Sequence, residues 1–210
     1  MFIELAEILD CPSCNDGFGL VAFVSEADRR RVLAGRLGCP ICEIEFPIAA
    51  GAIRLGEPGE PVDAEGGHAE GDGAEMALRL AALMGVAETN GSAVLLGPGL
   101  GEYAARLAAM SDRIEVLAVM SDETSLSLDD LESGVNPLIG LTDTWPVRSG
   151  ALDGVALKGG VAAPAEARRC LAHGRRLVVI QPRPDDLTAL EEAGFSTLAS
   201  DSRTWVGARS

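Results

Sequence analysis

The chain has 210 residues, a formal net charge of −15 at pH 7 and an apolar fraction of 47%. This length accommodates one domain or two small ones. The negative charge disfavours direct binding to nucleic acid or anionic lipid, because those ligands need clustered Lys and Arg. The longest unbroken apolar stretches, such as residues 177–180, are much too short to span a membrane.

The first ten residues carry Glu4 and Glu7 where a secretion signal carries basic residues, and they contain no uninterrupted apolar segment. The sequence therefore predicts a cytoplasmic protein. Three local basic groups, at 29–31, 168–169 and 175–176, could contact an acidic partner, but they are interpreted as solvated surface faces.

Four of the five cysteines form two matched Cys-x-x-Cys pairs. Cys11 and Cys14 are separated from Cys39 and Cys42 by 24 residues. Each pair can direct two thiolates at one centre, so the spacing predicts a tetrahedral zinc site. A redox motif or two disulfides are the alternatives, and both are less favoured in a cytosolic protein. A zinc ion held by four thiolates has no open position for water, so its predicted role is structural.

The segments around these cysteines resemble a known zinc-binding module. Residues 9–14 read Leu-Asp-Cys-Pro-Ser-Cys, residues 37–42 read Leu-Gly-Cys-Pro-Ile-Cys, and residues 46–55 form an apolar closing strand. They resemble the zinc ribbon of small activator subunits of tRNA and translation-factor methyltransferases, which is also found at the N-terminus of many bacterial class I methyltransferases. The resemblance covers most of residues 5–55. An insertion at 25–35 departs from the shortest ribbons and is predicted to be helical.

Residues 56–75 are rich in Gly, Pro and acidic residues and contain almost no large apolar residue. Such a segment buries too little surface to offset the entropy of ordering it, so it is predicted to be a linker. The predicted organisation is a zinc ribbon at 1–55, an acidic Gly/Pro linker at 56–75 and a second domain at 76–210.

The second domain alternates helical and strand patterns. We predict helices at 76–84, 102–110 and 165–172, and strands at 93–96, 114–120, 154–157 and 177–180. This alternation predicts an α/β fold: a Rossmann-like, mostly parallel sheet with helices on both faces.

A glycine loop follows the first of these strands. Gly97, Gly99 and Gly101 lie between a strand and a helix, where backbone can approach a nucleotide closely. With the order of elements, and with segments 153–157, 166–180 and 190–195, residues 76–210 resemble a small class I S-adenosylmethionine-dependent methyltransferase. The resemblance implies that the loop glycines contact S-adenosylmethionine.

This sequence departs from that family at three acidic positions around the cofactor. Leu95 stands where an acid helps to hold the methionine end, Met120 where a carboxylate binds the ribose, and Leu141 where an acid contacts adenine. Asp122 and Asp143 each lie two residues further on and are the candidate substitutes. A buried cofactor group left without its partner costs ~1–3 kcal/mol.

No catalytic residue is assigned. Residues 158–161 offer neither an aromatic clamp nor an Asn-Pro-Pro-Tyr-like motif, and Lys158, the only lysine, is predicted at a strand end facing the cleft. We therefore favour a non-catalytic methyltransferase-like protein with a structural zinc, a docking or stabilising subunit of a larger assembly with a protein partner. The alternative is an active S-adenosylmethionine-dependent methyltransferase with atypical cofactor contacts.

Overall fold

The computed structural model describes residues 1–14, 17–55, 73–86, 92–111, 113–120, 134–140, 144–161 and 163–210. Two of the predicted cofactor residues, Asp122 and Asp143, lie outside these described residues, and so does 56–72, which is most of the predicted linker. Within the described ranges, no helix is long and apolar enough to cross a membrane.

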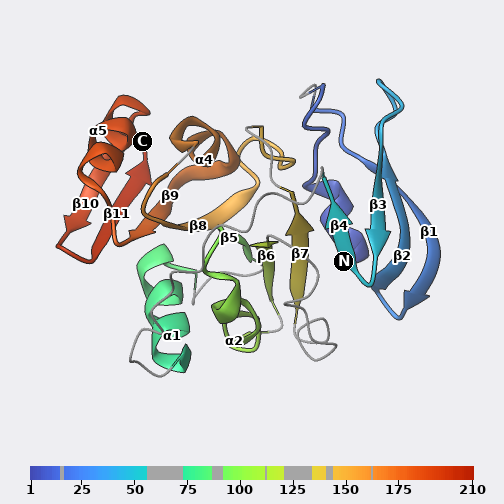
Figure 1. The fold of residues 1–210 in the computed structure, drawn as a ribbon, viewed down its shortest axis with the longest axis horizontal. Helices are drawn as coiled ribbons and strands as arrows, with labels where there is room; N and C mark the ends of the chain where they lie inside the picture. Colours follow the sequence, from blue (N-terminus) through green and yellow to red (C-terminus); the bar gives the residue numbers. More distant parts are fainter. Residues whose placement is uncertain are drawn as a thin grey trace.

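Within the described part of the chain, eleven strands form one sheet in the order β1-β2-β3-β4-β7-β6-β5-β8-β9-β11-β10 (Figure 1). The six strands from β4 to β9 in this order run parallel, and antiparallel strands extend the sheet at both ends. The strands are β1 (Val21–Asp28), β2 (Arg31–Gly38), β3 (Glu45–Ala49), β4 (Ala52–Arg54), β5 (Ser92–Leu96), β6 (Ile114–Met120), β7 (Val135–Ile139), β8 (Leu152–Lys158), β9 (Leu171–Ile180), β10 (Phe195–Ser200) and β11 (Thr204–Arg209). The helices are η1 (Ile3–Glu7), α1 (Gly73–Met84), η2 (Gly101–Tyr103), α2 (Ala104–Ala108), α4 (Pro164–Cys170) and α5 (Pro184–Glu192). The predicted α/β fold with a largely parallel, Rossmann-like sheet is confirmed.

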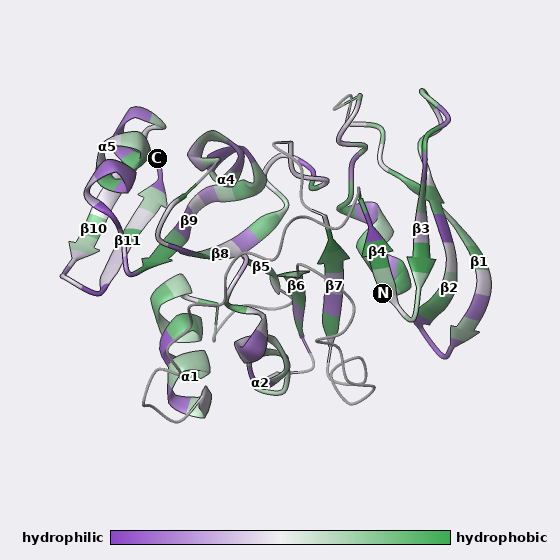
Figure 2. Cartoon of the chain, in the orientation of Figure 1, coloured by the Kyte–Doolittle hydropathy of each residue, from purple (hydrophilic) through white to green (hydrophobic). Residues whose placement is uncertain are grey.

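The central strands are apolar on both faces because both faces are covered, as expected for parallel strands. Alternate side chains of β5 point to opposite faces. Val94 and Leu96 pack with α1 and α2, whereas Leu95 belongs to a second core shared with α4, α5 and the N-terminal residues. Figure 2 shows the resulting concentration of apolar residues in the central strands.

The N-terminal residues 1–55 and the strands after residue 92 share this sheet and the second core. β4 pairs in parallel with β7, with Ile53 opposite Leu138, and the Leu55 amide donates to the Ile139 carbonyl at 2.8 Å. Pro137 has no N–H to donate to a neighbouring strand. It is compatible with this central position in β7 because β4 begins to pair with β7 only at the next residue, Leu138. The boundary predicted at 56–75 stays a prediction, but its two flanking regions are continuous in space.

Buried polar contacts reinforce this junction. Asn136 is fully buried, accepts the Phe2 amide at 2.7 Å and donates to the Glu115 carboxylate at 3.0 Å. Arg31 is also buried, and its guanidinium donates to the Val135 carbonyl. The interpretation of 29–31 as a solvated basic group is therefore wrong for Arg31.

Several predicted elements differ from the structure, most of them only in their bounds. Residues 25–35 lie in the β1–β2 hairpin instead of a helix, because cross-strand pairing overrides the favourable helix propensity of Glu, Ala and Arg. The helix predicted at 165–172 ends at Cys170, and its last two residues open strand β9. The first helix begins at Gly73, three residues earlier than predicted.

Candidate functional site

The four predicted zinc ligands meet at one point. The Sγ atoms of Cys11 and Cys42 lie 3.7 Å apart, as do those of Cys14 and Cys39, and all four lie within 4.8 Å of one another. Four sulfurs at ~2.3 Å from a tetrahedral zinc ion are ~3.8 Å from each other. A disulfide would bring two sulfurs to ~2.05 Å, and none of these cysteines is bonded in that way. The cluster therefore fits a zinc site.

The second Cys-x-x-Cys turn directs backbone N–H groups at its first thiol. The Ile41 amide donates to the Cys39 sulfur at 3.4 Å, and the amides of Cys42 and Ile41 lower the pKa of Cys39 to about 7. Cys14 and Cys11 differ from Cys39, because hydrogen bonding to Cys42 raises the pKa of Cys14 and burial raises that of Cys11. A metal ion that binds here must displace the protons of these thiols.

The glycine loop lies at the point where the strand order reverses, with β6 and β7 on one side of β5 and β8 and β9 on the other. Ligands of open α/β sheets bind outside the carboxyl ends of the strands at this point. The fold itself requires two of the glycines. A Cβ at Gly97 would lie 2.6 Å from the Leu157 side chain, and Gly99 has a φ of +78°. Gly101 has ordinary space for a Cβ, so the loop alone does not demonstrate a cofactor site.

Among the described residues, Leu95, Met120 and Lys158 lie at or next to the ends of the strands that carry and flank this loop. Leu95 is fully buried in β5, between Leu117 of β6 and Val155 of β8. Met120 ends β6, and its Cε lies 3.9 Å from the Cβ position of Gly101. Lys158 ends β8 as predicted, and its Cδ lies 3.3 Å from the Cβ position of Gly99. Leu95 and Met120 thus stand at two positions where the resemblance predicts acids, and Lys158 lies next to the loop at the end of β8.

The segment that follows β8 is held by a buried carboxylate. Asp186 accepts the amides of Gly160 at 2.9 Å, Val161 at 2.8 Å and Arg183 at 2.7 Å. Burial opposes ionisation of Asp186, but these three donors outweigh it and lower the pKa of its carboxyl. Because Asp186 also caps α5, its role in this position is to fix the backbone.

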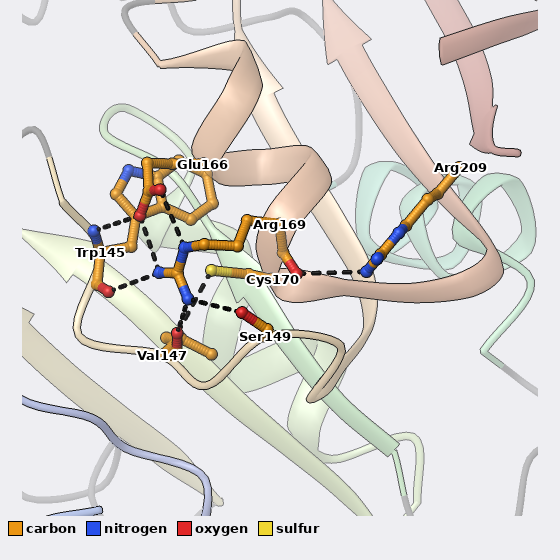
Figure 3. A network of polar contacts seen from close by, with 7 residues as sticks. All are labelled: Trp145, Val147, Ser149, Glu166, Arg169, Cys170 and Arg209. Carbon is orange, nitrogen blue, oxygen red and sulfur yellow. Dashed lines mark hydrogen bonds and ion pairs between the residues drawn. The ribbon is translucent and has the colours of Figure 1, made fainter. Parts of the chain in front are cut away.

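A polar network missed by the sequence analysis surrounds α4 (Figure 3). Arg169 forms two hydrogen bonds with the Glu166 carboxylate, at 2.8 and 2.7 Å, and donates to the carbonyls of Trp145 and Val147. Glu166 also accepts the Trp145 amide at 2.8 Å. Burial alone would raise the pKa of Glu166, but these donors lower it. Arg169 is therefore no solvated surface residue, and its i, i+3 spacing from Glu166 was the available signal.

Solved structures that share this architecture include class I S-adenosylmethionine-dependent methyltransferases. No protein-family model matches the chain, and no curated protein matches its sequence.

One similar structure is geranyl diphosphate C-methyltransferase from Streptomyces coelicolor A3(2) in complex with S-adenosyl-L-homocysteine. It is 12% identical with a TM-score of 0.54, over 65% of this chain and 76% of that chain. A geranyl diphosphate methyltransferase in complex with sinefungin is 13% identical with a TM-score of 0.52, over 65% and 78% of the two chains. The [4+2]-cyclase SpnF is 17% identical with a TM-score of 0.51, over 63% and 64%. At such identities the likeness shows the fold alone, and function depends on the site.

Proposed function

We propose that this protein is a non-catalytic, methyltransferase-like protein with a structural zinc ion, which acts as a docking or stabilising subunit of a larger protein assembly. The observation that carries this proposal is the set of side chains at the glycine loop. Leu95 is an aliphatic side chain buried among core residues, and the Met120 thioether is at best a weak acceptor, so neither can replace a carboxylate that binds a cofactor amine or hydroxyl. Two lost partners together would weaken cofactor binding by orders of magnitude.

The four-cysteine cluster supports the zinc part of the proposal. Its sulfur separations match tetrahedral coordination, and its residues lie in a region that packs into the main sheet through β4. A closed, four-thiolate site supplies folding energy and leaves no position for a substrate or a water nucleophile.

The distribution of exposed apolar side chains supports a protein partner. Of the ten large apolar residues that are exposed in the described part of the chain, seven lie in residues 1–55. They are Ile3, Phe18, Val21, Phe23, Val24, Ile41 and Ile44. A high share of exposed apolar side chains in this part of the chain favours contact with another protein. We propose no role in nucleic acid binding for this acidic chain.

The second candidate function is an active methyltransferase with atypical cofactor contacts. The glycine loop at the strand-order reversal favours it, and Asp122 and Asp143 would then be the cofactor acids. The reaction class would be transfer of a methyl group from S-adenosylmethionine.

Titration calorimetry with S-adenosylmethionine on the zinc-loaded protein separates the two candidates. The proposal predicts no binding at millimolar ligand, and micromolar binding would rule it out. The variant Met120→Asp supplies a carboxylate at the end of β6, beside the loop, and we expect measurable binding to appear in it. Met120→Leu is the matched control, which changes the side chain without adding an acceptor and is expected to remain inert.

A further inference from the structure

The segment Trp145–Gly150, which leads into β8, is held from two sides. On one side α4 binds it through Arg169 and Glu166, and on the other side it contacts residues 8–10, directly before the first zinc ligand Cys11. These contacts join the metal site to the helix layer over the sheet.

Main-chain hydrogen bonds and one buried carboxylate join the segment to residues 8–10, next to the metal site. The Arg148 amide donates to the Ile8 carbonyl at 2.8 Å, and the Asp10 amide donates to the Pro146 carbonyl at 3.2 Å. Asp10 is 3% exposed, and its Oδ1 accepts the Gly19 amide at 3.0 Å and the Arg148 Nε at 3.4 Å. Asp10 therefore ties the chain on both sides of the first Cys-x-x-Cys turn to this segment.

The contacts with the α4 side are equally specific (Figure 3). Arg169 donates to the carbonyls of Trp145 at 2.9 Å and Val147 at 2.8 Å, and the Gly150 amide donates to the Arg169 carbonyl at 2.8 Å. The side chains of Trp145 and Val147 are buried in the same core cluster as Leu9 and Cys11. The segment is thus bonded to both neighbours, and both contribute to its position.

We propose that the four-cysteine metal site, the segment Trp145–Gly150 and α4 form one cooperative unit, in which Asp10 and Arg169 are the positioning residues. Metal binding fixes residues 8–14, these fix the segment, and the segment fixes the start of β8. Because such coupling is reciprocal, loosening the segment from the α4 side must also weaken metal binding. This inference holds whether or not the cleft binds a cofactor.

Hydrogen exchange tests the forward direction on the full chain. After zinc is removed by a chelator under reducing conditions, we expect the amides of Trp145, Arg148 and Gly150 to exchange at least ten times faster, while those of α1 keep their protection. In the zinc-loaded variant Asp10→Ala the same amides are expected to exchange faster with one zinc still bound. The matched control Glu45→Ala, which removes an exposed ion pair with Arg36, is expected to leave them unchanged.

The rate of zinc transfer to a chromophoric chelator tests the reverse direction. We expect Arg169→Gln to release zinc roughly 5 to 20 times faster than the wild type, as expected for an ordinary coupling between two sites. Arg175→Gln, which removes the neighbouring ion pair with Asp153, is the control and is expected to release zinc at the wild-type rate. Unchanged release from folded Arg169→Gln, or unchanged exchange of the segment in Asp10→Ala, would overturn the proposal.

Discussion

The two candidate sites of this molecule differ in how many of their expected side chains are present. The four-cysteine site has its complete set of side chains, brought together from two turns with sulfur separations suited to one tetrahedral ion. The glycine loop has the expected place at the carboxyl end of β5, but Leu95 is buried in that strand and Met120 approaches Gly101, where the resemblance predicts carboxylates. The difference teaches that strand packing alone can account for the path of a glycine loop, whereas the geometry of four converging thiols points directly to a metal ion.

Removing one metal ligand is the strongest way to test this comparison. We expect Cys39→Ser to lose zinc and to lower the free energy of unfolding by ~3 kcal/mol or more, because metal binding contributes directly to folding. Metal analysis and thermal unfolding measure both effects. Ser196→Ala, at an exposed position of the edge strand β10 at the other end of the sheet, is the control. A Cys39→Ser protein that retains one zinc would contradict the assignment.

The pH dependence of metal binding tests whether the four thiols are the metal ligands. The pKa values of Cys11 and Cys14 are raised and that of Cys39 is about 7, so below pH 7 these three thiols carry protons that zinc must displace. With at least three protons released, affinity is expected to fall by roughly a factor of 10³ or more for each pH unit below 7. Competition with a chelator of known affinity at pH 6, 7 and 8 measures this slope. A flat profile would mean that the thiols are not the ligands.

The Glu166–Arg169 network is expected to have an effect of intermediate size. Glu166→Gln removes a carboxylate that accepts three N–H groups, at a cost of ~1–3 kcal/mol at neutral pH. Since the folded-state pKa of Glu166 is lowered, its stabilisation is present above its ordinary pKa of about 4.5 and is lost as the pH falls through the lowered value. Denaturant unfolding of both proteins from pH 7 to pH 3 should therefore show the difference closing. Glu191→Gln, at an exposed position, is the matched control for the loss of one carboxylate. If the stability difference between Glu166→Gln and the wild type did not change with pH, the ionised form of Glu166 would not be its cause.

The smallest expected effect is in the turn between β3 and β4. Ala50 and Gly51 both have positive φ, of 46° and 77°, as in a two-residue type I′ hairpin. Asn tolerates this conformation better than Ala, so Ala50→Asn should stabilise the protein by ~0.5 kcal/mol. Ala49→Asn, in the adjoining strand, is expected to give no gain. Equal effects of the two substitutions in chemical unfolding would contradict the turn assignment.

Local patterns predicted much of the fold. The strand at 114–120 was predicted with its observed bounds, and the spacing of the cysteines predicted their cluster. β7 was missed because Asn136 and Pro137 are poor strand residues, and they are accommodated only by neighbours that are distant in sequence. The 25–35 segment was predicted as a helix because its composition is helical, while its actual structure depends on pairing between strands.

The glycine loop also combines a feature that local sequence predicts with one that depends on contacts between distant residues. The sequence predicted its position after a strand. The close approach of Gly97 to the Leu157 side chain, which leaves no room for a Cβ, depends on the packing of two strands and could not be predicted locally. The contacts of Arg169 with Trp145 and Val147 span more than twenty residues and leave no periodic signal. Asp122 and Asp143 lie outside the described residues, so their predicted roles stay predictions.

Native mass spectrometry of the purified full chain, with S-adenosylmethionine added at millimolar concentration, tests the contrast between the two sites in one measurement. The account predicts a single species with one zinc ion and no bound S-adenosylmethionine. A metal-free protein with a bound cofactor would contradict it on both counts, and a zinc-loaded protein with a stoichiometric cofactor would contradict the non-catalytic role.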